Sequence, residues 1–464
     1  MRILLVAPAS GNWHHVGRAG LFSGRVFRFS MLSLLTVAAE TPPGVELDIV
    51  DEQLDEIRSS RKYDLVGISV MTATAPRAYE IARSFRRMGV PVVLGGMHAS
   101  FMPEEALQYG DAVCIGEAEG VWPQVVSDAR ATRLKPVYRA DAPHSLRGLN
   151  RPPRHLLAGR RYATLQAVQA TRGCPHRCAF CSVSAFHDGM FRARPVGQVL
   201  DEVKELPGRF FIFVDDSLTA DPDYARALFA GLIPLGKHWM SQATLGITDD
   251  ADLVRLAADS GCVGLFVGIE TFSNRNLESV EKGFNRVDEY RERVRMLHAS
   301  GIGVEAGIVF GFDSDGPEVF SEALRLLAEL EIDMIQVSIL TPLPGTPWFR
   351  AMSDRIVDRD WTHYDYHHAV FEPKRMSREQ LKAGHDWITS QFYRPDRILK
   401  RLARLAARGR CRRSLPYAAA LNGAYYGRVR RWHIRGWIPA ALEVRPQSSQ
   451  SPSTLPSKRR LELT

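Results

Sequence analysis

The sequence of 464 residues contains only six cysteines, and three of them fall within residues 174–181. Thiols crowded in this way do not form the spaced pairs of a disulfide scaffold, so we expect a reducing compartment, the cytoplasm. Long apolar runs are also missing. No stretch of the sequence reaches the roughly 18 apolar residues that cross a bilayer, and the apolar run before Pro8 is shorter than the core of a signal peptide. A hydrophobic content of 45% excludes intrinsic disorder for the chain as a whole.

Acidic residues are scarce in one part of the chain only. Residues 390–464 hold 17 Lys and Arg against 3 Asp and Glu, a net charge of +14, whereas residues 1–389 carry −6. The formal net charge of +8 therefore says nothing about a site in the body of the chain. It indicates instead a basic C-terminal segment suited to an anionic partner.

Short β-branched runs alternate with helical periodicity along two stretches of the chain, which predicts an α/β fold. In residues 1–135 we expect a Rossmann-like domain with strands at 3–7, 47–50, 64–69, 90–94 and 112–115. Residues 136–163, rich in Arg and Pro, are expected to form a linker. In residues 164–350 the alternation predicts a partial (β/α)6 barrel with strands at 165–171, 210–214, 239–244, 263–269, 303–309 and 334–340. Residues 351–464 lose the pattern, and we expect a mostly helical, basic C-terminal extension there.

The strongest chemical signal is the run Cys174-Pro-His-Arg-Cys178-Ala-Phe-Cys181, directly after the first expected barrel strand. Three thiolates on one short loop can bind three irons of a [4Fe-4S] cluster and leave the fourth iron open for a substrate. The alternative is a structural zinc site that completes four ligands with His176 or His187. His176 lies inside the loop, where it reaches the same metal ion as its neighbours only with difficulty, so the cluster is favoured.

This loop, with Thr171-Arg-Gly173 before it and an aromatic residue before its last cysteine, resembles the radical S-adenosylmethionine (SAM) superfamily. The resemblance implies that Cys174, Cys178 and Cys181 bind the cluster and that SAM chelates its open iron. Reductive cleavage of SAM then yields a 5′-deoxyadenosyl radical, which takes a hydrogen atom from an unactivated carbon. The implied electron donor is a flavodoxin or a ferredoxin.

The strand ends that follow resemble the SAM-contacting edges of this superfamily. The residues concerned are Asp215, Asp216, Gln242 and Glu270. Carboxylates and amides suit SAM because its ammonium and ribose groups donate hydrogen bonds. Asp215 and Asp216 have an alternative interpretation as caps of the helix expected to begin near residue 222.

The N-terminal domain resembles the cobalamin-binding domain of B12-dependent radical SAM enzymes. The matching runs are Val93-Leu-Gly-Gly-Met-His98, Pro103-Glu-Glu105 and Gly116-Glu117. The resemblance implies a cobalamin site at the carboxyl ends of the strands, formed by Ser69, Thr72, Gly95, Gly96, His98, Gly116 and Glu117. Small residues at these ends let a large cofactor approach the backbone. Turn formation without a ligand is the alternative for any single glycine.

A candidate cobalt ligand is His14, in the run Asn12-Trp-His14-His15-Val-Gly17. The base-off fingerprint of free-standing cobalamin proteins is Asp-x-His-x-x-Gly, so the run matches at the histidine and the glycine and lacks the aspartate. A metal-bound histidine donates its other nitrogen to a carboxylate or carbonyl, and the Asn12 amide oxygen is a weaker acceptor. The role of His14 is therefore a hypothesis.

Later runs resemble a subgroup that methylates polycyclic lipids and tetrapyrrole pigments. These runs are Gly311-Phe-Asp313, Leu340-Thr-Pro-Leu-Pro-Gly-Thr-Pro347, Trp361, Tyr364-Asp365 and Val370-Phe371. The resemblance implies a C-methyltransferase in which one SAM generates the substrate radical and methylcobalamin supplies the methyl group. A second SAM then methylates the reduced cobalamin again. A radical cyclase or a carbon–carbon bond-forming enzyme that acts on a lipid or tetrapyrrole is the first alternative. The loop with Pro342, Pro344 and Pro347 is stiff and is expected near the substrate entry.

The basic tail leaves its partner open. Residues 392–407 place Ile398, Leu399, Leu402 and Leu405 on one helical face between basic side chains, as in helices that lie on anionic membranes. Packing of this face on the barrel is the alternative. Tyr417, Tyr425, Tyr426, Trp432 and Trp437 interleave with arginines, which suits a membrane interface or, as a second alternative function, modification of RNA. We expect a small-molecule substrate and peripheral contact with the inner membrane surface, but no nucleic acid. Residues 445–464 are expected to be disordered.

Overall fold

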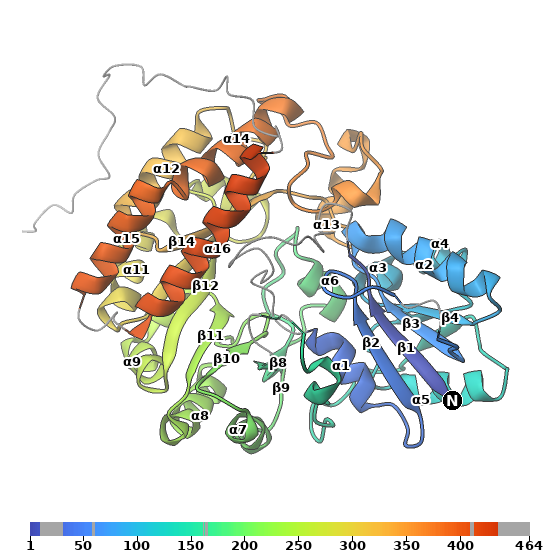
Figure 1. Cartoon of the computed structure of the whole chain (residues 1–464). Coiled ribbons are helices and arrows are strands. Elements are labelled where there is room, and N and C mark those ends of the chain that lie inside the picture. Colours follow the sequence, from blue (N-terminus) through green and yellow to red (C-terminus); the bar gives the residue numbers. More distant parts are fainter. Residues whose placement is uncertain (10–30, 58–60, 161, 163–165, 409–412, 435–464) are drawn as a thin grey trace, which may run out of the picture.

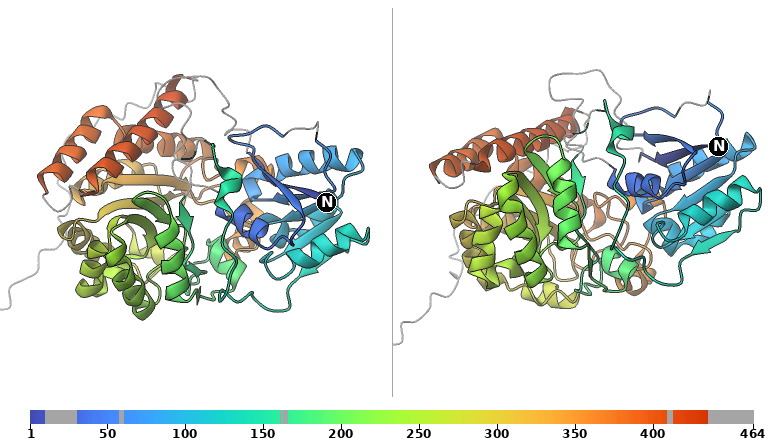
Figure 2. Two further views of the ribbon diagram at one scale, coloured as in Figure 1. Left: turned by 60° about the horizontal axis from the view of Figure 1, so that its bottom comes forward. Right: turned by 90° about the horizontal axis from the view of Figure 1, so that it is seen from below.

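The computed structural model describes residues 1–9, 31–57, 61–160, 162, 166–408 and 413–434. Two parallel six-stranded sheets organise them, one in the N-terminal domain and one in the barrel. Figure 1 shows the N-terminal sheet (blue to cyan) beside the barrel (green to yellow), with the last helices (orange to red) against the barrel. The two further views in Figure 2 show the same arrangement.

The N-terminal sheet has the order β2-β1-β3-β4-β5-β6, and every neighbouring pair is parallel. Its first five strands are β1 (Arg2–Ala7), β2 (Glu46–Asp51), β3 (Leu65–Ser69), β4 (Val92–Gly95) and β5 (Ala112–Ile115), so all five expected strands are confirmed. Its helices are α1 (Leu32–Ala39), α2 (Ala75–Arg87), α3 (Met97–Phe101), α4 (Pro103–Leu107) and α5 (Trp122–Arg130). Both faces are apolar because Ile3 and Leu5 belong to one core cluster and Leu4 and Val6 to the other.

A sixth strand, β6 (Val137–Arg139), lies within the range expected as a linker. It pairs in parallel with β5. Its central residue, Tyr138, is buried, and Tyr138 Oη donates a hydrogen bond to Asp128 Oδ2 (3.0 Å). Three residues are too few for a periodic signal, so only pairing with β5 and burial of one aromatic ring define this strand.

The barrel sheet has the linear order β14-β13-β12-β11-β10-β7. Its strands are β7 (Ala167–Val168), β10 (Phe210–Phe213), β11 (His238–Ala243), β12 (Cys262–Glu270), β13 (Gly303–Phe310) and β14 (Met334–Ile339), all parallel to their neighbours. The connecting helices are α7 (Val196–Glu205), α8 (Pro222–Leu232), α9 (Ala251–Asp259), α10 (Asn274–Ser279), α11 (Tyr290–Ala299) and α12 (Val319–Glu329). Among the described residues β7 and β14 do not pair, so the barrel is open, as expected of a partial (β/α)6 barrel.

The first barrel strand is much shorter than the expected 165–171. After β7 the chain forms a hairpin of β8 (Thr171–Arg172) and β9 (Arg192–Ala193), which encloses the cysteine loop and α6 (Ser182–His187). The strand is interrupted because the carboxylate of Asp215 accepts hydrogen bonds from the backbone N–H groups of Ala170 (3.1 Å) and Thr171. This hairpin is the structural base of the cysteine loop.

The C-terminal extension is helical, as expected, with α13 (Pro347–Ala351), α14 (Arg378–Phe392), α15 (Pro395–Ala407) and α16 (Leu415–Ile434). Three of the four expected apolar residues of α15 pack inward, since Leu405 is buried, Leu402 joins the same small cluster and Ile398 packs against the main core, whereas Leu399 is exposed. Its Arg401 guanidinium lies 4.0 Å from the centre of the Phe392 ring and donates to Asn422 Oδ1 (2.7 Å). Of the two interpretations of residues 392–407, packing on the barrel accounts for these contacts.

Two aromatic residues of α16, Tyr417 and Tyr425, also pack inward. Tyr417 stacks on Phe210 with ring centres 4.6 Å apart, and its hydroxyl lies 3.1 Å from His238 Nδ1. Tyr425 Oη donates to the buried Glu305 (3.0 Å). The expectation that Tyr417 and Tyr425 face a membrane or RNA is therefore wrong, because both rings complete the barrel packing. Trp437 and the side chain of Trp432 lie outside the described residues. In the described part of the chain, no helix has the length and apolarity that crossing a membrane requires.

Candidate functional site

The cysteine loop is held by the backbone of the barrel. Ala179 N donates to Val280 O (3.0 Å), and Trp348 N, at the start of α13, donates to Ala179 O (2.9 Å). Cys178 is buried, whereas Cys174 and Cys181 are half-buried. Burial raises the pKa of the Cys178 thiol to about 12, so the thiolate needs the positive charge of a bound metal. Three cysteines on a supported loop fit three irons of a [4Fe-4S] cluster.

Within the described residues, no side chain completes the alternative zinc site. The His176 ring stacks on Phe284 with centres 3.8 Å apart, and His187 Nδ1 faces Arg192 Nη2 at 3.4 Å. No three Cys, His, Asp or Glu side chains of the described residues gather around one point as ligands of a single ion must. A cluster does not impose this condition, because each thiolate binds a different iron.

Asp215 and Asp216 anchor the base of the cysteine loop. Asp215 is fully buried, and in addition to the two backbone bonds its carboxylate accepts Thr171 Oγ1 (2.6 Å). Burial raises the pKa of Asp215 to about 7. Asp216 Oδ2 accepts the N–H of Gly173 (2.9 Å). Neither residue caps α8, because Asp221 does so through the N–H groups of residues 223 and 224, and the capping interpretation is wrong.

The other two expected SAM contacts differ in their surroundings. Gln242 is exposed on β11. Glu270 ends β12 with φ at 64°, and its Oε1 lies 2.5 Å from Lys282 Nζ. Burial lowers the pKa of Lys282, but the Glu270 carboxylate and the Cys178 thiol outweigh it and raise that pKa above its usual value. Lys282 was not predicted, because one lysine between α10 and α11 carries no periodic signal.

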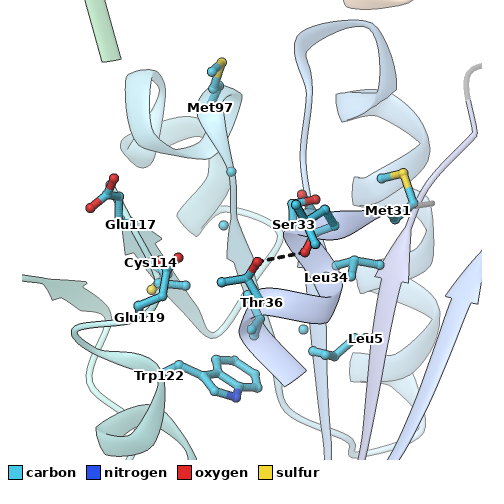
Figure 3. Close-up of a pocket in the computed structure, with 18 of the residues that line it drawn as sticks. Leu5, Met31, Ser33, Leu34, Thr36, Met97, Cys114, Glu117, Glu119 and Trp122 are labelled. Carbon is cyan, nitrogen blue, oxygen red and sulfur yellow. Dashed lines mark hydrogen bonds between the residues drawn. The ribbon is translucent and has the colours of Figure 1, made fainter. Parts of the chain in front are cut away.

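A pocket of about 470 Å³ lies between α1, the carboxyl ends of the N-terminal strands and the cysteine hairpin. Among the expected cobalamin residues Ser69, Gly95, Gly96, Gly116 and Glu117 line it. Its apolar side includes Leu5, Leu34, Cys114 and Trp122, as Figure 3 shows. The barrel contributes Gln169, Arg172, Phe186, His187, Val214 and Asp216. The sequence did not reveal the face of α1 that lines the pocket, from Leu32 to Val37.

Gly96 shows why this pocket needs glycine. Its φ is +93°, and a Cβ atom there would lie 2.8 Å from Val70 O and 3.3 Å from Ser69 Oγ. A side chain would therefore collide with the end of β3. At Gly116, by contrast, no atom lies within 4 Å of an added Cβ, which leaves the room there that a large cofactor needs to approach the backbone.

Thr72 and His98, also expected to contact cobalamin, are not among the residues that line this pocket. His98 Nδ1 lies 3.3 Å from Thr72 Oγ1, and its Nε2 lies 3.5 Å from Glu105 Oε1. The His98 ring meets Trp361 edge to face at 5.2 Å, and Trp361 Nε1 donates to Glu105 Oε1 (3.0 Å). The turn from β4 into α3 directs His98 toward the C-terminal extension. His14 lies outside the described residues.

Comparison with known families agrees with this architecture. Residues 20–126 match the B12 binding domain, and residues 168–327 match the radical SAM superfamily. These two matches identify the cofactors of the chain as cobalamin, SAM and a [4Fe-4S] cluster.

Relatives cover most of the chain. Bacteriochlorophyllide d C-12(1)-methyltransferase from Chlorobaculum tepidum is 30% identical over 384 residues, which are 80% of this chain and 84% of the relative. Hopanoid C-2 methylase from Rhodopseudomonas palustris is 25% identical over 394 residues, 79% of this chain and 72% of the relative. The solved structure of TsrM, a radical SAM methyltransferase from Kitasatospora setae with cobalamin and [4Fe-4S] cluster bound, has the same fold, with a TM-score of 0.60 and 19% identity over 76% of this chain and 78% of that one. The chain belongs to the cobalamin-binding radical SAM methyltransferase family.

Proposed function

We propose that this enzyme is a C-methyltransferase that acts on an unreactive carbon of a polycyclic small molecule, either a tetrapyrrole pigment or a polycyclic lipid. One observation carries the proposal. The pocket in the N-terminal domain shares its wall with the hairpin that holds the cysteine loop, through Arg172 and His187, and with Asp216, which anchors that loop. This shared wall supports transfer between groups bound at the two places.

Different residues of the chain are assigned to different parts of cofactor binding. When bound, the cluster supplies the electron that cleaves SAM, and cobalamin carries the methyl group that is transferred. We assign cluster binding to Cys174, Cys178 and Cys181. Asp216 orients the loop through the Gly173 N–H, and Glu270 with Lys282 supplies a buried ion pair beside Cys178.

The substrate class rests on the named relatives and on the surface near the cluster. The relatives methylate bacteriochlorophyllide d and hopanoids, as their names state. Tyr366 lies beyond α13 in the chain, and its carbonyl accepts the N–H of Ile339 at the end of β14 (2.7 Å). It keeps 42% of its surface exposed. The Cys181 thiol lies within electrostatic range of the Tyr366 hydroxyl. An accessible aromatic ring near the cysteine loop supports a planar or polycyclic substrate.

The loop with Pro342, Pro344 and Pro347 supports an entry route at the same end of the barrel. Gly345 has φ at +83°, and a Cβ atom on it would collide with the Phe101 ring of α3. The loop therefore spans from the end of β14 to the cobalamin-binding domain. Its stiffness keeps that side of the site at a constant width.

The test uses anaerobic enzyme reconstituted with iron, sulfide and cobalamin. It is incubated with SAM deuterated in its methyl group, a chemical reductant and either a bacteriochlorophyllide or a hopanoid. A product heavier by one labelled methyl group supports the proposal. A product without label identifies the cyclase alternative instead, since a cyclase transfers no methyl group. A comparison of pigment and lipid extracts from a deletion strain and its parent identifies the native substrate.

We further propose a flavodoxin or ferredoxin as electron donor and a peripheral membrane contact through α15. Leu399 is 67% exposed on that helix, beside the exposed Lys400. Arg404 and Arg408 instead pair with Glu331 and contribute less to an external surface. Flotation with anionic vesicles tests the contact. Leu399→Glu with Lys400→Glu is expected to abolish flotation, and unchanged flotation would contradict it.

A further inference from the structure

Four charged side chains connect the cobalamin-binding domain to the base of the cysteine loop. Glu117 and Glu119 follow β5, Arg172 is on β8, and Arg192 is on β9. Glu117 Oε2 accepts Arg192 Nη1 (2.9 Å), and Glu117 Oε1 lies 2.5 Å from Arg192 Nη2 and 3.2 Å from Arg172 Nη1. Arg172 also pairs with Glu119. One carboxylate thus binds both strands of the hairpin at once.

This network is buried. The side chains of Glu117, Glu119 and Arg172 are 10%, 6% and 9% exposed, and that of Arg192 is 19% exposed. Ion pairs removed from water lose hydration, so a complete pair contributes little net stability compared with apolar side chains. Removing or misplacing one partner, however, leaves a buried charge and is strongly destabilising, so the pairs define one geometry sharply. A bidentate pair of arginine and carboxylate adds a directional constraint.

The network is placed around the cysteine loop. Arg172 directly precedes Gly173 and Cys174. In the antiparallel pairing of β8 with β9, Arg172 lies opposite Arg192. His187, at the end of α6, lies 3.8 Å from Glu117 Oε1. The carboxylate also accepts the N–H of His144 (3.2 Å), whose carbonyl receives Arg192 Nη1 (2.6 Å). Both oxygens of Glu117 are therefore engaged by protein groups.

We propose that Glu117 is a positioning residue that fixes the cysteine loop relative to the cobalamin pocket. The resemblance implied a direct cobalamin contact for this residue, but its oxygens bind the hairpin although the side chain lines the pocket. SAM at the cluster has to face cobalamin at a constant distance. Glu117 keeps the cobalamin-binding domain and the cysteine hairpin in a constant relative position. The inference rests on the proposed function because it concerns transfer between these two cofactors.

The first experiment measures loop order without any cofactor. Hydrogen exchange is followed by mass spectrometry in the full-length protein and in Glu117→Gln, Arg192→Gln and the double variant. The matched control is Asp128→Asn, since Asp128 is a buried carboxylate of the same domain that bonds Tyr138 and Gln124. We expect exchange in residues 171–193 to become about tenfold faster in both single variants, and no faster in the double variant. Exchange no faster than in Asp128→Asn would overturn the proposal.

The second experiment separates positioning from cofactor binding. Reconstituted Glu117→Gln is expected to retain the cluster and cobalamin absorbance and to form 5′-deoxyadenosine within about twofold of the unchanged enzyme. Transfer of the methyl group of SAM to reduced cobalamin is expected to slow by about tenfold or more. Loss of bound cobalamin would overturn the proposal in favour of a direct contact.

Two further outcomes are distinguishable. If Glu117→Gln does not fold, Arg192→Lys replaces it in the exchange experiment, because lysine keeps the charge without the bidentate geometry. Exchange over residues 171–193 is expected to increase in this variant, by less than in Arg192→Gln. No increase would overturn the proposal. If the unchanged enzyme binds both cofactors and transfers no methyl group, the proposed function fails, while the exchange experiment still decides the role of Glu117.

Discussion

The ammonium group of Lys282 lies 2.5 Å from Glu270 Oε1, and both side chains are buried. Gly268 makes this contact possible, since a Cβ atom there would collide with both charged groups. The strand that ends in Gly268-Ile-Glu270 therefore presents its carboxylate to a lysine from the next connection. The pair places a positive group beside Cys178, one of the three residues assigned to the cluster.

Replacing Lys282 by methionine is expected to destabilise the protein. The substitution leaves Glu270 as a buried carboxylate without its cation, which costs about 3 kcal/mol in the free energy of unfolding. Urea unfolding of the cluster-free protein measures this. Lys374→Met is the control, because Lys374 pairs with the part-exposed Asp313 and the pair contributes less than about 1 kcal/mol. Equal effects of the two substitutions would contradict the prediction.

Replacing Cys178 by alanine is expected to remove the cluster and all SAM cleavage. Iron content, the visible absorbance of the cluster and 5′-deoxyadenosine formation each report this loss. Cys262→Ala is the matched control, since Cys262 is also buried and lies on β12, away from the cysteine loop in sequence, with its thiol near Gly264 O. Continued 5′-deoxyadenosine formation by the Cys178 variant would contradict the assignment of Cys178 as a cluster ligand.

Replacing Gly96 by alanine is expected to weaken cobalamin binding. The positive φ and the close Val70 carbonyl force the turn after β4 to move, which costs at least about 1 kcal/mol for the left-handed backbone alone. We expect about tenfold weaker binding of hydroxocobalamin in an absorbance titration. Gly44→Ala controls for backbone strain, because Gly44 also has positive φ but nothing lies within 4 Å of its added Cβ. Unchanged affinity of the Gly96 variant would be the contrary result.

The stabilising effect of Glu117 is expected to depend on pH. Burial raises its pKa, but Arg192 and Arg172 outweigh burial and lower that pKa from 4.5 to about 2. A folded-state pKa below the unfolded one stabilises the protein fully above pH 4.5, and this contribution is lost as the pH falls from there toward 2. Glu117→Gln should thus lower the free energy of unfolding by about 3 kcal/mol at pH 7 and by less at pH 3. Denaturant unfolding at both values checks this, and a difference that grows on acidification would refute it.

Part of the candidate site could be predicted from the sequence because the features that mark it lie close together in the chain. The spacing of Cys174, Cys178 and Cys181 lies within eight residues, and glycines at the strand ends mark where the backbone bends. The strands were also readable, because buried parallel strands are short apolar runs. By contrast, β6 has three residues and depends on its partner β5, so no periodicity marks it.

The sequence by itself determined the two α/β units, the cysteine loop and the basic character of the tail, since each depends on neighbouring residues and on composition. Only the tertiary structure decided that His98 turns away from the pocket toward Trp361, that Tyr417 and Tyr425 fill the barrel rather than meet a partner, and that Glu117 binds Arg172 and Arg192. These contacts join residues 55 to more than 250 positions apart or depend on the face to which a helix is turned. Their energies come from burial and charge pairing, which exist only after the domains have packed.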